Sequence, residues 1–195
     1  IASMQVKKEI MNMYELSYKN YLLSLDKFIF DKTSDDEEIN KTEDIIDYLN
    51  SRITEFLIEL SSKVQPSLER KIGTYFHVIN DIERIGDHAY NFYEMYADMK
   101  SKDLKFSKAA LEEIHEFNAV LLKMFELSKQ IFICKDKNKL AKLHELENET
   151  DNLKAKFSTN HYNRIKEKEC VSELSPFYTS IMTEFERIGD HLTNI

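Results

Sequence analysis

The sequence has very few of the residues that interrupt helices. It contains three glycines and two prolines among 195 residues, while 42% of its residues are hydrophobic and 32% are charged. This composition excludes a disordered chain and disfavours a β-rich fold, because chains of both kinds are richer in glycine, proline and turn residues. The length is sufficient to bury a sizeable hydrophobic core. The sequence therefore predicts an all-α protein.

Cysteine and basic residues are also scarce. Cys134 and Cys170 form neither a Cys-x-x-Cys pair nor a disulfide-rich pattern, which predicts a reducing, cytoplasmic setting. With 27 Lys and Arg against 35 Asp and Glu, the formal net charge is -8. This charge disfavours nucleic acid and acidic membrane surfaces as partners. It also repels free phosphate unless a cation lies between them.

Long apolar segments are missing as well. The sequence has no secretory signal and no apolar run near the ~18 to 20 residues that span a bilayer, so we expect the chain as given to be soluble. It begins at Ile1 rather than methionine and stops at Ile195, within a helical pattern that includes Asp190. We interpret it as a piece of a longer polypeptide.

One string of six residues occurs twice. Glu-Arg-Ile-Gly-Asp-His spans residues 83–88 and recurs at residues 186–191, which is 103 positions later. A chance match of this length is improbable in so short a chain. The sequence therefore predicts an internal repeat with two halves of about 100 residues each.

Apolar residues recur with helical spacing through both halves. Pro66 and Pro176 suit the opening turns of a third and a sixth helix, and Ser34 or Asp35 suits the N-cap of the second. Short connections favour antiparallel neighbours. We therefore expect two similar antiparallel three-helix bundles, residues 1–100 and 101–195, with the last helix truncated. The expected helices cover about residues 6–30, 38–63 and 66–99, then stretches containing Leu111 to Ile131 and Leu143 to Phe157, and a last helix from Ser175.

The repeated string places two carboxylates beside a buried helix face. With about 100° between successive residues and Ile79 at zero, Glu83 lies at about +40° and Asp87 at about +80°. The first lies within the apolar arc and the second at its edge. Arg84 and His88, at about +140° and +180°, point away.

Four helices carry the same Glu-x-x-x-Asp spacing on the flank of their apolar stripe. The pairs on the second and third helices are 40 residues apart, and those on the fifth and sixth are 39 residues apart, both measured between the Glu residues. Adjacent helices of each half therefore offer two facing pairs. The eight candidate metal ligands are Glu43, Asp47, Glu83, Asp87, Glu147, Asp151, Glu186 and Asp190.

Carboxylates this close to a core need compensation for their charge, because burial and mutual repulsion raise their pKa values. The sequence leaves three arrangements open: shared protons, ion pairs with Arg84, Arg187 or nearby lysines, and a bound metal ion. We favour the metal, because facing Glu and Asp side chains build metal sites in helical bundles. An oxygen-only set suits hard cations such as Mg²⁺, Mn²⁺ or Fe³⁺.

Several signatures of catalysis are missing from the sequence. The eight candidate ligands lack the Glu-x-x-His spacing of di-iron oxidases, and the sequence shows neither a nucleophile paired with a base nor a glycine-rich phosphate loop. We therefore do not expect an enzyme.

The remaining residues of the repeated string are assigned supporting roles. Gly86 and Gly189 lie inside expected helices, where glycine costs roughly 1 kcal/mol relative to alanine. We expect them to permit close helix approach where the two halves meet. His88 and His191 project away from the carboxylates, and we expect them to support the ligands or to face solvent.

The doubled Glu-Arg-Ile-Gly-Asp string, on the last helix of each three-helix repeat, resembles the PhoU family of bacterial phosphate-transport regulators. The resemblance covers nearly the whole chain and implies a six-helix fold of two similar bundles. Some members bind multinuclear metal clusters through Glu/Asp-x-x-x-Asp motifs. The resemblance thus implies metal ions, whether iron, manganese, zinc or magnesium, at the eight carboxylates named above.

One stretch departs from the pattern of free-standing members. These usually carry Gln-Pro-x-x-x-Asp-Leu-Arg before the first motif, whereas Gln65-Pro66 continues here as Ser-Leu-Glu-Arg-Lys. The chain is thus more similar to the domain fused behind the membrane part of bacterial sodium-dependent phosphate cotransporters. This implies a regulatory domain at the cytoplasmic face of the membrane, partnered by a transporter membrane domain of the same or another chain.

The alternative is a stand-alone cytoplasmic PhoU-type protein. Such a protein would be a negative regulator of a phosphate ABC transporter and its two-component signalling. Homo-oligomerisation stays open in either case.

Overall fold

A computed structural model describes residues 2–32 and 35–195. Helices and short connections account for this part of the chain, which contains no β-strand. None of its helices is both long enough and apolar enough to cross a membrane. The elements are α1 (Ala2–Phe30), α2 (Asp36–Ser61), α3 (Pro66–Ser101), α4 (Lys108–Cys134), α5 (Asn138–Lys166), the 3-10 helix η1 (Ser172–Leu174) and α6 (Ser175–Asn194).

The helix boundaries follow local signals in the sequence. Pro66 opens α3, and Pro176 lies in the first turn of α6. The hydroxyl of Ser107 accepts a hydrogen bond from the backbone N–H of Ala110 and thereby caps α4. Asp35 occupies the N-cap position of α2 without a capping hydrogen bond from its side chain. The other expected cap, Ser34, lies outside the described residues.

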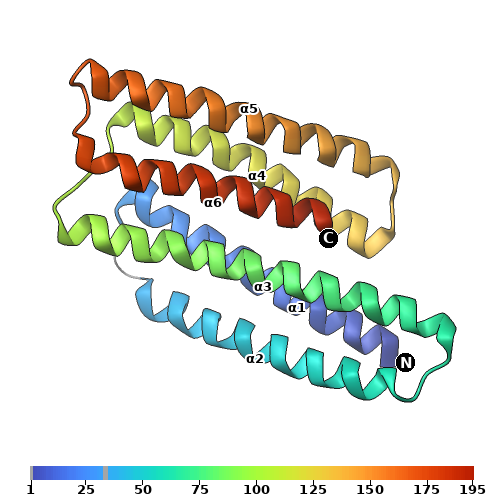
Figure 1. The fold of residues 1–195 in the computed structure, drawn as a ribbon. Helices are drawn as coiled ribbons and strands as arrows, with labels where there is room; N and C mark the ends of the chain where they lie inside the picture. The colour runs from blue at the N-terminus through green and yellow to red at the C-terminus, as the bar shows by residue number, and fades with distance from the viewer. Residues whose placement is uncertain (1, 33–34) are drawn as a thin grey trace.

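The six helices form two similar antiparallel three-helix bundles, as expected. Helices α1 to α3 make one bundle and α4 to α6 the other, and α3 lies along α6 where the two bundles meet (Figure 1). The core is continuous across this boundary. The ring of Phe185 on α6 packs 5.1 Å from that of Phe92 on α3 and 4.7 Å from that of Phe117 on α4. This shared core fixes the position of each bundle relative to the other.

The two glycines of the repeated string lie within the bundles. A Cβ atom on Gly86 would lie 3.5 Å from Ile46 on α2 and from Ser17 on α1. A Cβ atom on Gly189 would lie 3.5 to 3.7 Å from Met124 and Leu121 on α4. The expectation that these glycines lie where the two halves meet is thus wrong, because each faces helices of its own half.

Candidate metal centre

The first group of predicted carboxylates lies between α2 and α3. Glu43 and Asp47 flank the fully buried Ile46 on α2, so the packing of Ile46 against α3 brings both toward that helix. Glu83 and Asp87 lie one turn apart on α3, and both are half-buried. The spacing of four residues aligns each pair on one helix face.

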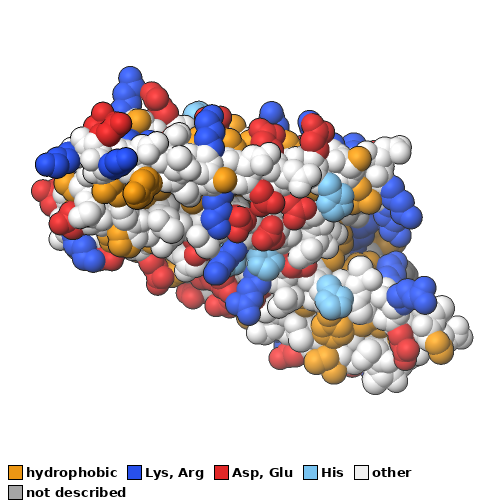
Figure 2. All heavy atoms as spheres, turned by 45° about the horizontal axis from the view of Figure 1, so that its top comes forward, with side chains coloured by type: hydrophobic (Ala, Val, Ile, Leu, Met, Phe, Trp, Pro, Cys, Tyr) orange, Lys and Arg blue, Asp and Glu red, His pale blue; other side chains and the backbone are white. Residues whose placement is uncertain are grey.

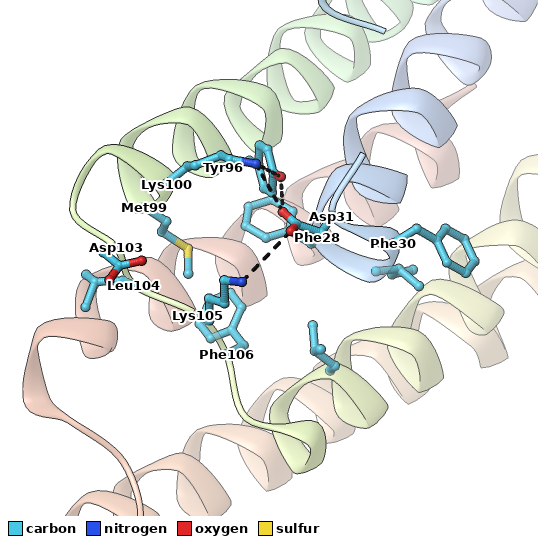
Figure 3. Close-up of a pocket in the computed structure, with 12 residues that line it drawn as sticks. Phe28, Phe30, Asp31, Tyr96, Met99, Lys100, Asp103, Leu104, Lys105 and Phe106 are labelled. Atoms are coloured by element: carbon cyan, nitrogen blue, oxygen red, sulfur yellow. Dashed lines mark hydrogen bonds and ion pairs between the residues drawn. The ribbon is translucent and has the colours of Figure 1, made fainter. Parts of the chain in front are cut away.

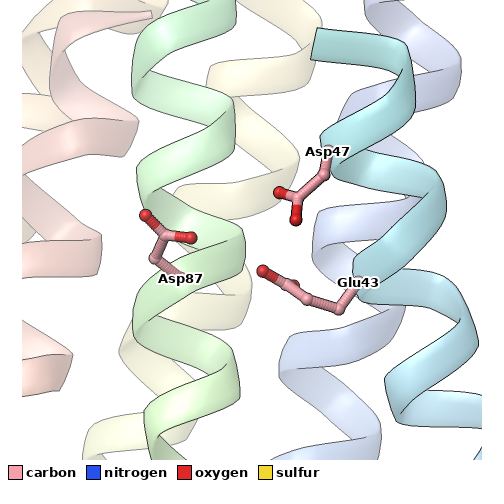
Figure 4. Close-up of side chains that lie close together, drawn as sticks. All are labelled: Glu43, Asp47 and Asp87. Carbon is pink, nitrogen blue, oxygen red and sulfur yellow. The ribbon is translucent and has the colours of Figure 1, made fainter. Parts of the chain in front are cut away.

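Three of these four side chains converge. Glu43, Asp47 and Asp87 each offer an oxygen atom, and these oxygens lie within 4.8 Å of one another. Figure 4 shows Glu43 and Asp47 extending from α2 toward α3, where Asp87 lies. Glu83 is not part of this close group but borders it, since Asp87 and Asp47 both contribute to raising its pKa. We name Glu43, Asp47, Glu83 and Asp87 the first cluster.

Negative charge predominates in the first cluster. Burial, together with repulsion from Asp47, Asp87 and Glu83, raises the pKa of Glu43 to about 7. Burial likewise raises the pKa values of Glu83 and Asp87, against the opposing charge of Arg84. Atom Oε2 of Glu43 is buried and has no hydrogen-bond partner among the described residues. Protonation of Glu43 or a bound cation would relieve this repulsion.

The second predicted group, Glu147 and Asp151 on α5 with Glu186 and Asp190 on α6, is arranged more loosely. Burial raises the pKa of Asp190, followed by repulsion from Glu147, Glu186 and Asp151, so all four carboxylates lie near one another. However, among the described residues only the first cluster brings three candidate ligand atoms within 4.8 Å. We name Glu147, Asp151, Glu186 and Asp190 the second cluster. Figure 2 shows that acidic side chains with basic neighbours gather near the middle of one face of the molecule.

A lysine distinguishes the second cluster from the first. The ammonium group of Lys154 donates a hydrogen bond to Oε1 of Glu186 over 2.9 Å, and both side chains are about 30% exposed. The matching position on α2 is Asn50, because Glu43 and Glu147 are 104 residues apart. In the first cluster the cationic neighbour is Arg84, which lies 3.6 Å from Asp87 and is 56% exposed. The ion-pair hypothesis thus fits the second cluster better than the first.

The donor set of the first cluster suits a hard metal cation. Its candidate ligands are carboxylates only, which Mg²⁺, Mn²⁺ and Fe³⁺ prefer over softer ligands. A cation between α2 and α3 would relieve the repulsion that raises the pKa of Glu43 and would provide a partner for its buried oxygen. The first cluster therefore fits the metal site expected from the sequence, and the metal itself stays a hypothesis.

The two histidines of the repeated string lie between the bundles rather than in solvent. Atom Nδ1 of His88 lies 2.5 Å from Oε2 of Glu184, and Nδ1 of His191 lies 2.8 Å from Oδ1 of Asp81. The two imidazole rings stack with centroids 5.4 Å apart. Both carboxylates are buried. The expectation of solvent-facing histidines is therefore wrong.

Sequence reasoning overlooked Asp81, Glu184 and Lys154. Asp81 and Glu184 are 103 residues apart, as are His88 and His191, so the two His–carboxylate contacts are related by the internal repeat. This equal spacing was a signal that could have identified the carboxylates in advance. Nothing in the local pattern around Lys154 distinguished it from the exposed lysines of α5.

Comparison with known proteins supports the fold and the repeat. A family model described as PhoU domain matches residues 10–95 and 114–195. A phosphate-specific transport system accessory protein, PhoU homolog 1 of Thermotoga maritima, is 28% identical over 160 residues, which is 81% of this chain and 68% of that protein. The corresponding PhoU homolog of Clostridium acetobutylicum is 26% identical over 163 residues, which is 82% of this chain and 73% of that protein.

A solved structure has the same architecture. The crystal structure of PhoU from Pseudomonas aeruginosa superposes with a TM-score of 0.88, covering 99% of this chain and 92% of that one at 18% identity. At this identity the match establishes the fold alone. The PhoU domain matches, however, extend over most of the chain and fall on both three-helix bundles. The chain therefore belongs to the PhoU family.

Proposed function

We propose that the protein is an accessory regulator of phosphate transport. The observation that carries this proposal is the match to PhoU domains over both bundles, together with two relatives named as accessory proteins of phosphate-specific transport systems. Its role is regulatory rather than catalytic: it shifts a transporter between states by binding one state more tightly than the other. The transporter or its signalling partner is the expected binding partner.

The stand-alone form is the better supported of the two expected contexts. Both named relatives are accessory proteins, which favours a separate cytoplasmic regulator over a domain fused to a sodium-dependent cotransporter. The fused form is a second candidate, favoured by Arg70-Lys71 in the place of the Asp-Leu that follows Gln-Pro-x-x-x in free-standing members. Detection of the native polypeptide by immunoblotting separates the two, because a fused transporter would be much larger and confined to the membrane fraction.

We further propose that the first cluster binds a divalent or trivalent metal ion. Glu43, Asp47 and Asp87 would supply the ligand oxygens, with Glu83 beside them. A bound cation would supply positive charge that holds α2 against α3. The second cluster, in which Lys154 already neutralises Glu186, would bind metal more weakly. Metal occupancy would thus couple to the rigidity of the first bundle.

Deletion of the gene in its host tests the regulatory proposal. We expect radiolabelled phosphate uptake in phosphate-rich medium to rise on deletion and to return to normal with the wild-type gene. A variant carrying Glu43→Gln and Asp87→Asn should restore control only in part, whereas Glu37→Gln, an exposed acid elsewhere on α2, should restore it fully. Unchanged uptake in the deletion strain would contradict the regulatory proposal.

The metal proposal has its own readout. Elemental analysis of protein purified without chelator should find iron, manganese, zinc or magnesium in the wild type and less in the Glu43→Gln and Asp87→Asn variant. Absence of metal from both, after dialysis against these ions, would contradict metal binding while leaving regulation to be judged by uptake.

A further inference from the structure

A cavity of about 530 Å³ lies at the opposite end of α3 from its Pro66 terminus. Its walls are the last turn of α1 with Asp31, the last turns of α3, the connection that follows α3, and Leu111 on α4 (Figure 3). Tyr96, in its wall, is nine residues beyond Asp87, or roughly 13 Å along the helix axis. No residue of either carboxylate cluster lines the cavity. Its volume lies within the usual range for small-molecule sites.

The floor of the cavity is apolar and largely aromatic. Phe28 and Met99 are buried, and Leu104, Phe106 and Leu111 are half-buried. The ring of Phe28 packs 6.0 Å from that of Phe106 and 5.6 Å from that of Tyr96, in tilted and edge-on arrangements. These packed rings form a preformed surface on which a flat apolar molecule could stack.

Three donors converge at the mouth of this cavity. The hydroxyl of Tyr96 donates a hydrogen bond to Oδ1 of Asp31, and Nζ of Lys100 lies 3.5 Å from the same oxygen. Lys105 reaches from the connection after α3, with Nζ 4.0 Å from Oδ2 of Asp31 (Figure 3). The hydrogen bond from Tyr96 and the two lysines hold the pKa of Asp31 below its usual value. The mouth of the cavity therefore favours an anion, and in this structure the anion is the carboxylate of Asp31.

The ion pairs between Asp31 and the two lysines are weak enough to be replaced by contacts to a ligand. Asp31, Lys100 and Lys105 are all exposed, with side-chain exposures of 59%, 49% and 79%. Ion pairs this exposed change an equilibrium by only roughly two- to fivefold. The same lysines can therefore transfer to the anionic group of a ligand when its apolar body fills the floor. Asp103 also lines the cavity, but it lies outside ion-pair distance of Lys100 and Lys105, which both pair with Asp31.

We propose that this cavity binds a small planar aromatic molecule that carries an acidic group. The aromatic body rests against Phe28 and Phe106, and the acidic group takes the place of Asp31 between Lys100 and Lys105. Asp31 closes the empty site as an internal anion. The proposal does not depend on metal binding or on the phosphate-transport role.

A matched pair of fluorescent probes tests this proposal. Anilinonaphthalene sulfonate carries an anionic group on a planar naphthalene ring, and N-phenylnaphthylamine has the same aromatic rings without the charge. Titration of the intact protein should give saturable binding of the sulfonate. Leu111→Trp, which fills the cavity, should abolish that binding while circular dichroism and the melting transition show an intact fold. Unaltered binding to this variant would place the probe elsewhere and overturn the proposal.

Substitutions at the mouth distinguish recognition of the charge from apolar adsorption. Asp31→Asn removes the competing anion and should tighten sulfonate binding roughly two- to fivefold, whereas Lys100→Met with Lys105→Met should weaken it by about tenfold. Lys102→Met is the matched control, since Lys102 lies outside the cavity lining. The neutral probe should respond to none of these changes. Equal effects on both probes, or no effect on the sulfonate, would overturn the assignment of Lys100 and Lys105 as anion-binding groups.

Discussion

Replacing Glu43 by glutamine should stabilise the metal-free protein at alkaline pH. Burial and neighbouring carboxylates raise the pKa of Glu43 to about 7, whereas the usual value is 4.5. Between these values the folded protein retains a proton that the unfolded chain has lost. The free energy of unfolding therefore falls as the pH rises through this window. Glutamine has nearly the same shape but no charge, so it removes this cost.

The size of the effect follows from the same shift. At about 1.4 kcal/mol per pKa unit, the rise of the pKa from 4.5 to about 7 lowers the free energy of unfolding by roughly 3 kcal/mol. Glu43 is only half-buried, and water screens part of this interaction. We therefore expect the variant to be more stable than the wild type by about 1 to 2 kcal/mol above pH 7, and to be nearly equal to it below about pH 4.5.

Urea unfolding followed by far-UV circular dichroism measures this difference. Both proteins are compared in chelator at about pH 5 and about pH 8, so that titrating groups common to both cancel. Adding manganese at about pH 8 should reverse the order, because a ligand present at a hundred times its dissociation constant stabilises the folded state by about 2.7 kcal/mol. The variant, which lacks one ligand, should gain less. Glu37→Gln serves as the control for the loss of one acidic charge on α2.

One result would refute this reasoning. If Glu43→Gln destabilised the chelated protein at about pH 8 by 1 kcal/mol or more, the charge of Glu43 would be stabilising the fold through ion pairs. The first cluster would then be structural, and no cation would be required to explain its burial.

Three further variants test residues of the second cluster, the repeated string and the boundary between the bundles. Lys154→Met removes the cation beside Glu186 and should strengthen metal binding at the second cluster by about tenfold, measured by calorimetric titration. Glu83→Gln with Glu186→Gln should lower the bound metal in elemental analysis with helicity unchanged; a lower melting temperature without metal in either protein would instead indicate ion pairs. His88→Ala leaves the buried carboxylate of Glu184 without its partner and should lower the free energy of unfolding by about 1 to 3 kcal/mol in urea, and an unchanged value would show that this contact adds no stability.

The helices and the repeat were accessible from the sequence because their signals are local. Helical spacing of apolar residues and the opening prolines depend only on neighbours along the chain, so α3 and α6 begin where Pro66 and Pro176 predict. The Glu-x-x-x-Asp spacing likewise fixes which residues share a helix face, and Glu43, Asp47 and Asp87 do converge. Their pairing across α2 and α3 followed from the antiparallel packing of adjacent helices.

Only the tertiary structure determines which helices bury a second face against the other bundle. Helical periodicity predicts a single buried arc for α3, but α3 packs against α6 of the second bundle as well as against α1 and α2. His88, assigned to the outer side, therefore lies against Glu184 of the second bundle. Lys154 reaches Glu186 because of the way α5 and α6 pack. Likewise, Lys100 and Lys105 lie near Asp31 because of where α1, α3 and the connection after α3 end. A periodic pattern gives the rotation of a residue about its own helix, but only packing fixes its distance to another.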